Sequence, residues 1–190
     1  MRLNLGCGRD IRDGWVNIDC RPAPGVDVVC DFGGKTVLPF GDDTVTLSEG
    51  SHVIEHLTDP LPFMEELHRV TVPGGRAVFR CPYGSSDDAD EDPTHVRRMF
   101  HGSWGFFGQP NYWRADYGYR GDWEPVEVML LISPDHAGLS DADLQAAVMT
   151  RRNVVGEMVA ELRAVKPIRA QDKALRDHTT VRLMRPRAAP

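Results

Sequence analysis

The sequence predicts an α/β fold built on a mostly parallel sheet. Short apolar segments that end at a glycine or an acid alternate with turns and with one segment of helical periodicity. The first stretch, residues 3–19, follows the order strand, glycine turn, strand, acid. With 190 residues, of which 41% are hydrophobic, the chain has the size and composition of a single domain with a normal core.

Four short strands are expected in the first part of the chain, over residues 3–5, 15–18, 26–31 and 45–49. Gly6 and Gly8 follow the first strand, where the missing Cβ lets the backbone turn sharply and approach a ligand. Asp19 and Asp31 stand at the ends of the second and third strands.

Helical signals follow the fourth strand. Ser51 opens the segment SHVIEHL, in which we expect a helix to begin, and Pro60 suits the first turn of the next helix. Apolar residues recur every three positions over 61–70, and Pro73-Gly74-Gly75 predicts the end of that helix. A fifth strand is expected over 76–81.

Residues 83–123 break this pattern, because they are rich in glycine, aspartate and aromatic side chains. We interpret them as an insert or lid within a single domain spanning 1–190; a small second core or a dimer interface is the alternative. A strand over 127–133, a helix from Ser140 to about Arg152 with Asp143 in the capping box, and a strand over 179–184 follow. Residues 154–166 suit either a strand or a helix, and the Pro- and Ala-rich end should fray.

Composition excludes several classes of protein. The formal charge of −6 argues against broad binding to a nucleic-acid backbone, and no apolar run is long enough to span a membrane. The N-terminus enters a strand at once, without a signal peptide. The four cysteines are scattered without a C-x-x-C pair, which predicts free thiols in a reducing, cytoplasmic compartment rather than a zinc site.

The glycine turn points to a nucleoside ligand without a pyrophosphate. A dinucleotide fingerprint needs a third glycine where this chain has Ile11, and no phosphate-binding P-loop motif is present. An acid at the end of the second strand, here Asp19, is where a ribose diol is usually held. S-adenosylmethionine is such a ligand, because it has an adenine, a ribose and a charged amino-acid end but no pyrophosphate.

Six segments in order resemble the class I S-adenosylmethionine-dependent methyltransferases, above all the small bacterial and phage members of the methyltransferase-11 type. They are LNLGCG (3–8), GWVNID (14–19), VDVVCDF (26–32), LPF (38–40), SHVIEHL (51–57) and ELHRVTVPGGRAVF (66–79). The resemblance covers about the first 83 residues; DPTHVRRM (92–99) also resembles a segment that small members carry. It implies a Rossmann-like fold with a seven-stranded sheet.

The resemblance also implies roles for matching residues. Leu5, Gly6, Cys7 and Gly8 would bring the backbone against the methionine end of the cofactor. Asp19 would accept both ribose hydroxyls, and Asp31 with Phe32 would hold the adenine. Ser51 and His52 would border the methionine and the transferred methyl group.

One departure from the family concerns the first crossover. Ten residues separate Gly8 from Asp19, too few for a full helix, so the first helix is expected to be shortened or replaced by a loop. The N-terminal helix that often covers the cofactor is also missing. One side of the site should therefore be open, or covered by the aromatic insert or by a partner chain such as a second copy in a homodimer.

Methyl transfer from a sulfonium is an in-line displacement that mainly requires alignment and exclusion of water. Candidates for a base are His52, Glu55, His56 and His95, of which we select His52 and His95 as catalytic candidates. Glu55 or His56 could instead form hydrogen bonds inside the fold. No third ligand accompanies the histidine pair 52 and 56, so no metal site is predicted.

The predicted function is methyl transfer to a small-molecule acceptor or to a glycan- or lipid-linked one. DNA base methylation is disfavoured, because the sequence after the fourth strand lacks the Asn- or Asp-Pro-Pro-Tyr motif. Two alternatives are a non-catalytic binding module with the same fold and a nucleic-acid methyltransferase that uses Arg97, Arg98, Arg151 and Arg152.

Overall fold

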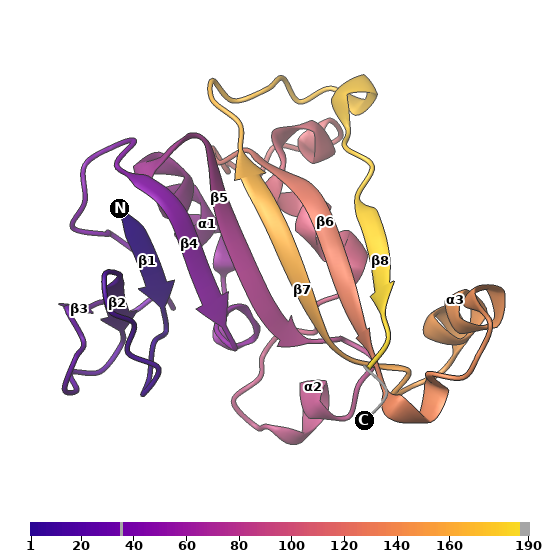
Figure 1. Ribbon diagram of the computed structural model, residues 1–190. Coiled ribbons are helices and arrows are strands. Elements are labelled where there is room, and N and C mark those ends of the chain that lie inside the picture. Colours follow the sequence, from indigo (N-terminus) through magenta and orange to yellow (C-terminus); the bar gives the residue numbers. More distant parts are fainter. Residues whose placement is uncertain (35, 187–190) are drawn as a thin grey trace.

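The computed structural model describes residues 1–34 and 36–186, and it is organised around one eight-stranded sheet (Figure 1). The strands are β1 (Arg2–Leu5), β2 (Val16–Asp19), β3 (Val28–Val29), β4 (Val45–Ser51), β5 (Thr71–Pro82), β6 (Trp123–Ile132), β7 (Val155–Ala164) and β8 (Thr180–Met184). Their spatial order is β3-β2-β1-β4-β5-β7-β6-β8. β7 is antiparallel to both neighbours, whereas the other described pairs are parallel. The predicted Rossmann-like α/β class is confirmed.

The sheet has one strand more than the seven expected, because the ambiguous segment 154–166 contains β7. Its side chains alternate strictly: Met158, Ala160 and Leu162 are fully buried, whereas Glu157 and Arg163 point to the other face. This period of two, rather than helix propensity, decides its structure. The third strand is shorter than predicted, and β6 begins earlier, at Trp123.

The described helices are α1 (Pro60–Val70), α2 (Asp88–Glu91) and α3 (Asp141–Thr150), and the 3-10 turns are η1 (Ile54–His56), η2 (His101–Phe107), η3 (Gln109–Tyr112), η4 (Pro134–His136) and η5 (Lys173–Leu175). Asp59 caps α1 by accepting a hydrogen bond from the Leu61 N–H. Ser140 caps α3 and bonds Asp143, as the capping box predicts.

One helix prediction is wrong. The segment SHVIEHL forms only η1, because the Glu55 carbonyl accepts the N–H groups of Val96 and Arg97 from a distant segment instead of a helical partner. The helix predicted over 61–70 is confirmed as α1, but Pro73-Gly74-Gly75, which were expected to end it, lie within β5. The pairing of β5 with β4 shifts register there, and Gly74 has a φ of 75° that accommodates the irregularity.

A loop replaces the first helix between β1 and β2. The buried side chains of Asn4 and Asn17 hold it: the Asn4 amide donates to Asn17 Oδ1 (3.0 Å) and to the Asp10 carbonyl (2.6 Å), and Asn17 Oδ1 also accepts from the Arg12 N–H (2.9 Å). The loop therefore has a defined shape without a helical turn.

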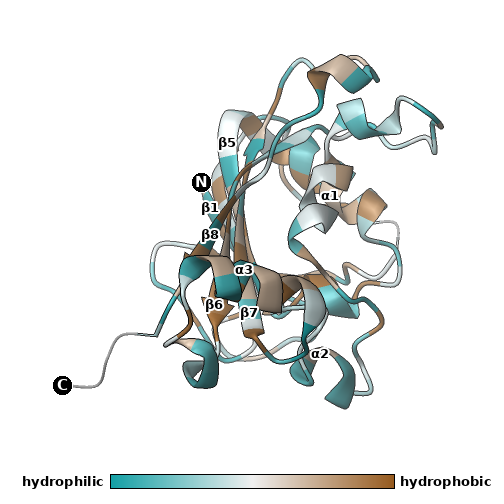
Figure 2. Cartoon of the chain, turned by 90° about the vertical axis from the view of Figure 1, so that its right-hand side faces the viewer, coloured by the Kyte–Doolittle hydropathy of each residue, from teal (hydrophilic) through white to brown (hydrophobic). Residues whose placement is uncertain are grey.

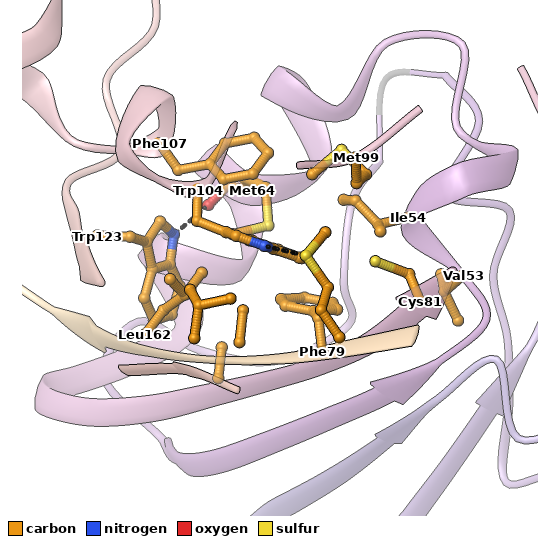
Figure 3. Packing of buried hydrophobic residues seen from close by; sticks show 14 of the residues in the cluster. Val53, Ile54, Met64, Phe79, Cys81, Met99, Trp104, Phe107, Trp123 and Leu162 are labelled. Atoms are coloured by element: carbon orange, nitrogen blue, oxygen red, sulfur yellow. Dashed lines mark hydrogen bonds between the residues drawn. The ribbon is translucent and has the colours of Figure 1, made fainter. Parts of the chain in front are cut away.

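The aromatic insert supplies much of the core on one face of the sheet. Trp104 is fully buried and stacks on Phe79 of β5, with ring centroids 5.6 Å apart and planes 17° apart. Its indole donates to the Met158 sulfur, and the Trp123 indole donates to the Met64 carbonyl (2.9 Å), as Figure 3 shows. Residues 83–123 therefore hold α2, η2 and η3 and pack into the main core rather than a separate one.

The opposite face of the sheet is covered by no α-helix of the described residues (Figures 1 and 2). Ion pairs cross that face instead: Arg76 with Glu161 (2.6 Å), Arg80 with Glu157, and Arg163 with Glu124. No described helix has the length and apolar content needed to cross a bilayer. The predicted frayed end falls mainly on residues 187–190, outside the described residues.

Candidate active site

A cavity of about 260 Å³ lies where β1, β2 and β4 end. Gly6 follows β1, Asp19 ends β2, and His52 follows β4; the carboxyl edge of a parallel sheet is the usual place for a ligand in such folds. The lining residues are Gly6, Asp19, Cys20, Asp31, Phe32, Gly33, His52, Val53, His56 and Leu57. Five of them are predicted cofactor-binding residues, namely Gly6, Asp19, Asp31, Phe32 and His52.

Close packing requires the first glycine of the turn. Gly6 has a φ of 62°, and a Cβ built on it would lie 2.5 Å from Cγ2 of Val53. Gly8 also has a positive φ, 51°, but a Cβ there would meet nothing within 4 Å. Gly6 is therefore needed for the approach of η1 to the end of β1, whereas Gly8 leaves open space beside the turn.

Asp19 joins this turn to the second strand. Its Oδ2 accepts the Gly8 N–H at 2.8 Å, and its Oδ1 accepts the Arg21 N–H at 3.1 Å. Partial burial opposes ionisation, but these backbone donors outweigh it and lower the pKa of Asp19. The carboxylate is thus charged at neutral pH and keeps lone pairs for a ligand.

Asp31 and Phe32 form the wall next to β3. Asp31 is exposed, and its Oδ1 accepts the Gly33 N–H at 2.8 Å. The Phe32 ring is buried against Phe63, with centroids 4.8 Å apart. A polar acceptor thus stands beside an apolar surface, an arrangement that suits a nucleobase.

His52 stands at the cavity with a strained backbone. Its φ of 55° is unusual for a residue other than glycine and marks a sharp turn after β4. Its Nε2 lies 2.9 Å from Glu157 Oε1, and its Nδ1 lies 3.1 Å from Glu55 Oε1. Glu157 also accepts from Arg80; burial opposes ionisation of this carboxyl, but Arg80 and His52 lower its pKa. Glu157 therefore orients the imidazole through a hydrogen bond, and the Glu55 carboxylate lies beside it.

The remaining predicted residues lie near the cavity without lining it. The side chains of Leu5 and Cys7 are buried in the core, whereas Gly8 and Ser51 are exposed at strand ends. The His95 side chain is only 7% exposed and packs on His56, with ring centroids 4.8 Å apart. Their roles toward a cofactor or acceptor stay predictions.

The sequence reasoning missed four lining residues, Cys20, Gly33, Val53 and Leu57, and it named His56 among the possible bases without selecting it. Cys20 directly follows Asp19, and Gly33 follows Phe32, so proximity to the predicted acids could have indicated both. The other three lie in or beside η1, which faces the cavity because it is a tight turn rather than the expected helix.

A second cavity, of about 370 Å³, lies between the start of α1 and the insert. Phe106 and Tyr117 line it, and both are largely exposed. Tyr112 lines it as well; burial raises the pKa of its hydroxyl to about 12, and this hydroxyl donates to the Phe106 carbonyl at 2.7 Å. Tyr112 is thus a structural group here rather than a base.

The comparisons with known proteins agree with this geometry. Residues 7–79 match the model of the methyltransferase domain family. Over 44 residues the chain is 49% identical to an uncharacterised methyltransferase of Mycolicibacterium vanbaalenii, covering 23% of this chain and 17% of that protein. Over 70 residues it is 34% identical to a demethylmenaquinone methyltransferase of Paenarthrobacter aurescens, covering 37% and 27%. The chain thus spans less than a third of the length of these curated relatives.

Solved structures show the same fold. An S-adenosylmethionine-dependent methyltransferase from Archaeoglobus fulgidus matches with a TM-score of 0.55 and 17% identity, over 85% of each chain. The [4+2]-cyclase SpnF matches with a TM-score of 0.53 and 16% identity, over 86% of this chain and 74% of that one. The match over residues 7–79 and the shared fold support a class I methyltransferase domain, with the loop 6–15 in place of the first helix.

Proposed function

We propose that this chain binds S-adenosylmethionine in the cavity at the ends of β1, β2 and β4 and transfers its methyl group to an acceptor. One observation carries the proposal: Gly6, Asp19, Asp31 and His52 come from four separate strand ends and line a single cavity. In this family fold, that edge of the sheet is where a nucleoside is bound.

The residues present suit such a cofactor. Each Asp19 oxygen accepts one backbone N–H, which leaves further lone pairs for two ribose hydroxyls. The empty space beside Gly8 would admit the methionine end close to the backbone. Phe32 and Leu57 offer apolar surface for the adenine ring, and Asp31 offers an acceptor for its amino group.

When bound, the cofactor supplies a methyl group already activated on a sulfonium. The protein then has to align the acceptor and exclude water. His52 is the catalytic candidate that lines the cavity, and Glu157 orients it through a hydrogen bond. Such an imidazole could take a proton from the acceptor during transfer.

The acceptor belongs to the small molecules or to glycan- or lipid-linked intermediates. The cavity of about 370 Å³ beside Phe106 and Tyr117 has the size of a small-molecule site, and the insert 83–123 contributes those two rings. We therefore retain the insert as the element that shapes the acceptor site. The cytoplasmic location and a homodimer are further predictions.

The nucleic-acid alternative has less support. Arg97 donates to the carbonyls of Leu57 and Thr58, Arg98 pairs with Asp90 (2.7 Å), and Arg152 pairs with Asp87 (2.7 Å). Three of the four arginines on which that alternative depends are thus engaged within the protein. A non-catalytic binding module is the second candidate, because one fold can serve unrelated functions.

Mass spectrometry of the ligand that co-purifies with the intact chain tests the proposal. We expect S-adenosylmethionine or its demethylated product, released when the protein is denatured. A binding module would carry a ligand but give no methylated product with any acceptor extract. Purified chain that retains neither compound, and that takes up neither when it is added, would contradict the proposal.

A further inference from the structure

Two segments that the sequence singled out separately, SHVIEHL and DPTHVRRM, are joined in the structure. The N–H groups of Val96 and Arg97 both donate to the Glu55 carbonyl, at 2.9 and 3.1 Å, and Arg97 Nε donates to the Leu57 carbonyl at 2.8 Å. These bonds fix His95 against η1, where its ring meets the His56 ring.

Glu55 is a buried carboxylate without a hydrogen-bond partner. The residue is 2% exposed, and neither side-chain oxygen accepts a hydrogen bond from the described residues. His52 Nδ1 lies 3.1 Å from Oε1, but the two groups lack hydrogen-bond geometry. An unpaired buried charge is strongly unfavourable, so a cation is the expected partner.

Two histidines face that carboxylate. The ligand atoms offered by Glu55, His56 and His95 all lie within 4.8 Å of one another. His95 Nδ1 is buried and has no hydrogen-bond partner among the described residues. The ligand atoms around a tetrahedral metal ion at ordinary bond lengths lie about 3.4 Å from one another. Side-chain rotations that bring the three ligand atoms closer together would therefore allow all three to bind one ion.

The second ring nitrogen of each imidazole lies near a polar group of the segment 92–94. His56 Nδ1 lies 3.2 Å from the Thr94 carbonyl and 3.1 Å from the Thr94 hydroxyl. His95 Nε2 points toward Asp92, 3.8 Å from Oδ2, and Asp92 Oδ1 in turn accepts from the Thr94 hydroxyl at 2.6 Å. Histidines that bind metals commonly have such a carbonyl or carboxylate behind the ring.

We propose that Glu55, His56 and His95 bind a divalent transition-metal ion. Two imidazoles and one carboxylate are the ligand set of zinc and related ions, and three protein ligands leave a position open for a further molecule. His56 also lines the cavity that contains Asp19 and His52, so the proposed metal site adjoins the proposed cofactor site. A role in holding the acceptor rests on the proposed function; the binding of the ion does not.

The test uses the full chain, stripped of metal with a chelator and then titrated with Zn²⁺. We expect one ion per chain by elemental analysis after gel filtration, and a rise of the melting temperature by roughly 5–10 °C at a hundredfold excess over Kd. Glu55→Gln and His95→Ala should each lower the Zn²⁺ affinity at least tenfold, whereas His178→Ala, which removes an exposed histidine outside the cluster, should leave it unchanged.

The melting temperature of the metal-free Glu55→Gln variant shows whether Glu55 is a metal ligand or an acid that stabilises the fold. Without metal, Glu55→Gln should melt at or above the wild-type temperature, because it removes an unpaired buried charge. Wild-type chain that binds no Zn²⁺, variants that bind as tightly as wild type, or a lower melting temperature of metal-free Glu55→Gln would each overturn the proposal. Binding of S-adenosylmethionine is measured in a separate titration. A chain that binds Zn²⁺ but not S-adenosylmethionine would contradict the proposed function and leave the metal site supported.

Discussion

Gly8 donates its backbone N–H to the Asp19 carboxylate at 2.8 Å, and this bond joins the turn after β1 to the end of β2. It places the carboxylate beside the space that Gly8 leaves open. The two features that predicted a nucleoside site from sequence are therefore one structural unit.

The two glycines of the turn should respond differently to substitution. Gly6→Ala should destabilise the fold by about 2–4 kcal/mol, because it adds a collision with Val53 to the backbone strain of a positive φ. Gly8→Ala is the matched control, with strain but no collision, and should lose about 1–2 kcal/mol. Urea unfolding measures both values, and equal losses would show that Val53 moves aside.

Asp31 should recognise the adenine amino group. Asp31→Ala should weaken binding of S-adenosylhomocysteine about tenfold, the usual effect of losing one hydrogen bond to a charged group. The inosine analogue, which lacks that amino group, provides the control. It should bind wild type and variant equally in a competition assay; an equal loss for both ligands would assign Asp31 a structural role.

His68 should make stability depend on pH. This buried residue on α1 bonds the Val165 carbonyl through Nε2 at 3.0 Å, and burial lowers its pKa from 6.5. The unfolded chain therefore binds a proton at higher pH than the folded chain, so stability falls as pH decreases below about 6.5. His68→Gln should flatten this part of the curve in urea unfolding between pH 5 and 8; an unchanged slope would exclude His68 as the cause.

The ion pair between Asp122 and Arg169 should be essential to the fold. Asp122 is fully buried and accepts from the backbone N–H groups of Gln109 and Arg169 and from the Arg169 guanidinium. Asp122→Asn should destabilise the protein by about 3 kcal/mol, since it leaves the partly buried Arg169 guanidinium with the Asp177 carboxylate alone among its charged partners in the described residues. The exposed pair of Arg152 with Asp87 is the comparison, and Asp87→Asn should leave the unfolding midpoint nearly unchanged. Similar midpoints for both variants in guanidinium unfolding would contradict this reasoning.

The sequence predicted those site residues whose position depends only on the nearest strand. Gly6, Asp19 and Asp31 could be placed because an acid or glycine at a strand end has the same position in any parallel sheet. It could not predict that Glu55 meets His95, because that contact depends on the Glu55 carbonyl bonding a distant segment. The same bonds prevent the helix that was expected to begin in the segment SHVIEHL.

The aromatic insert shows a second limit. Its ring density indicated a lid, but composition cannot distinguish a ring that covers a ligand from one that covers a sheet. Trp104 and Phe107 fill the core, whereas Phe106 and Tyr117 remain exposed at a cavity. The stacking of Trp104 on Phe79 is a contact between distant segments, which composition does not reveal.

The most direct test is calorimetric titration of S-adenosylmethionine into the wild-type chain, Asp19→Ala and the exposed control Asp135→Ala. We expect the wild type and Asp135→Ala to bind with equal affinity. Asp19→Ala should bind at least a hundredfold more weakly, because it loses a charged acceptor of two ribose hydroxyls. An unchanged affinity of a folded Asp19→Ala variant would contradict the proposed site.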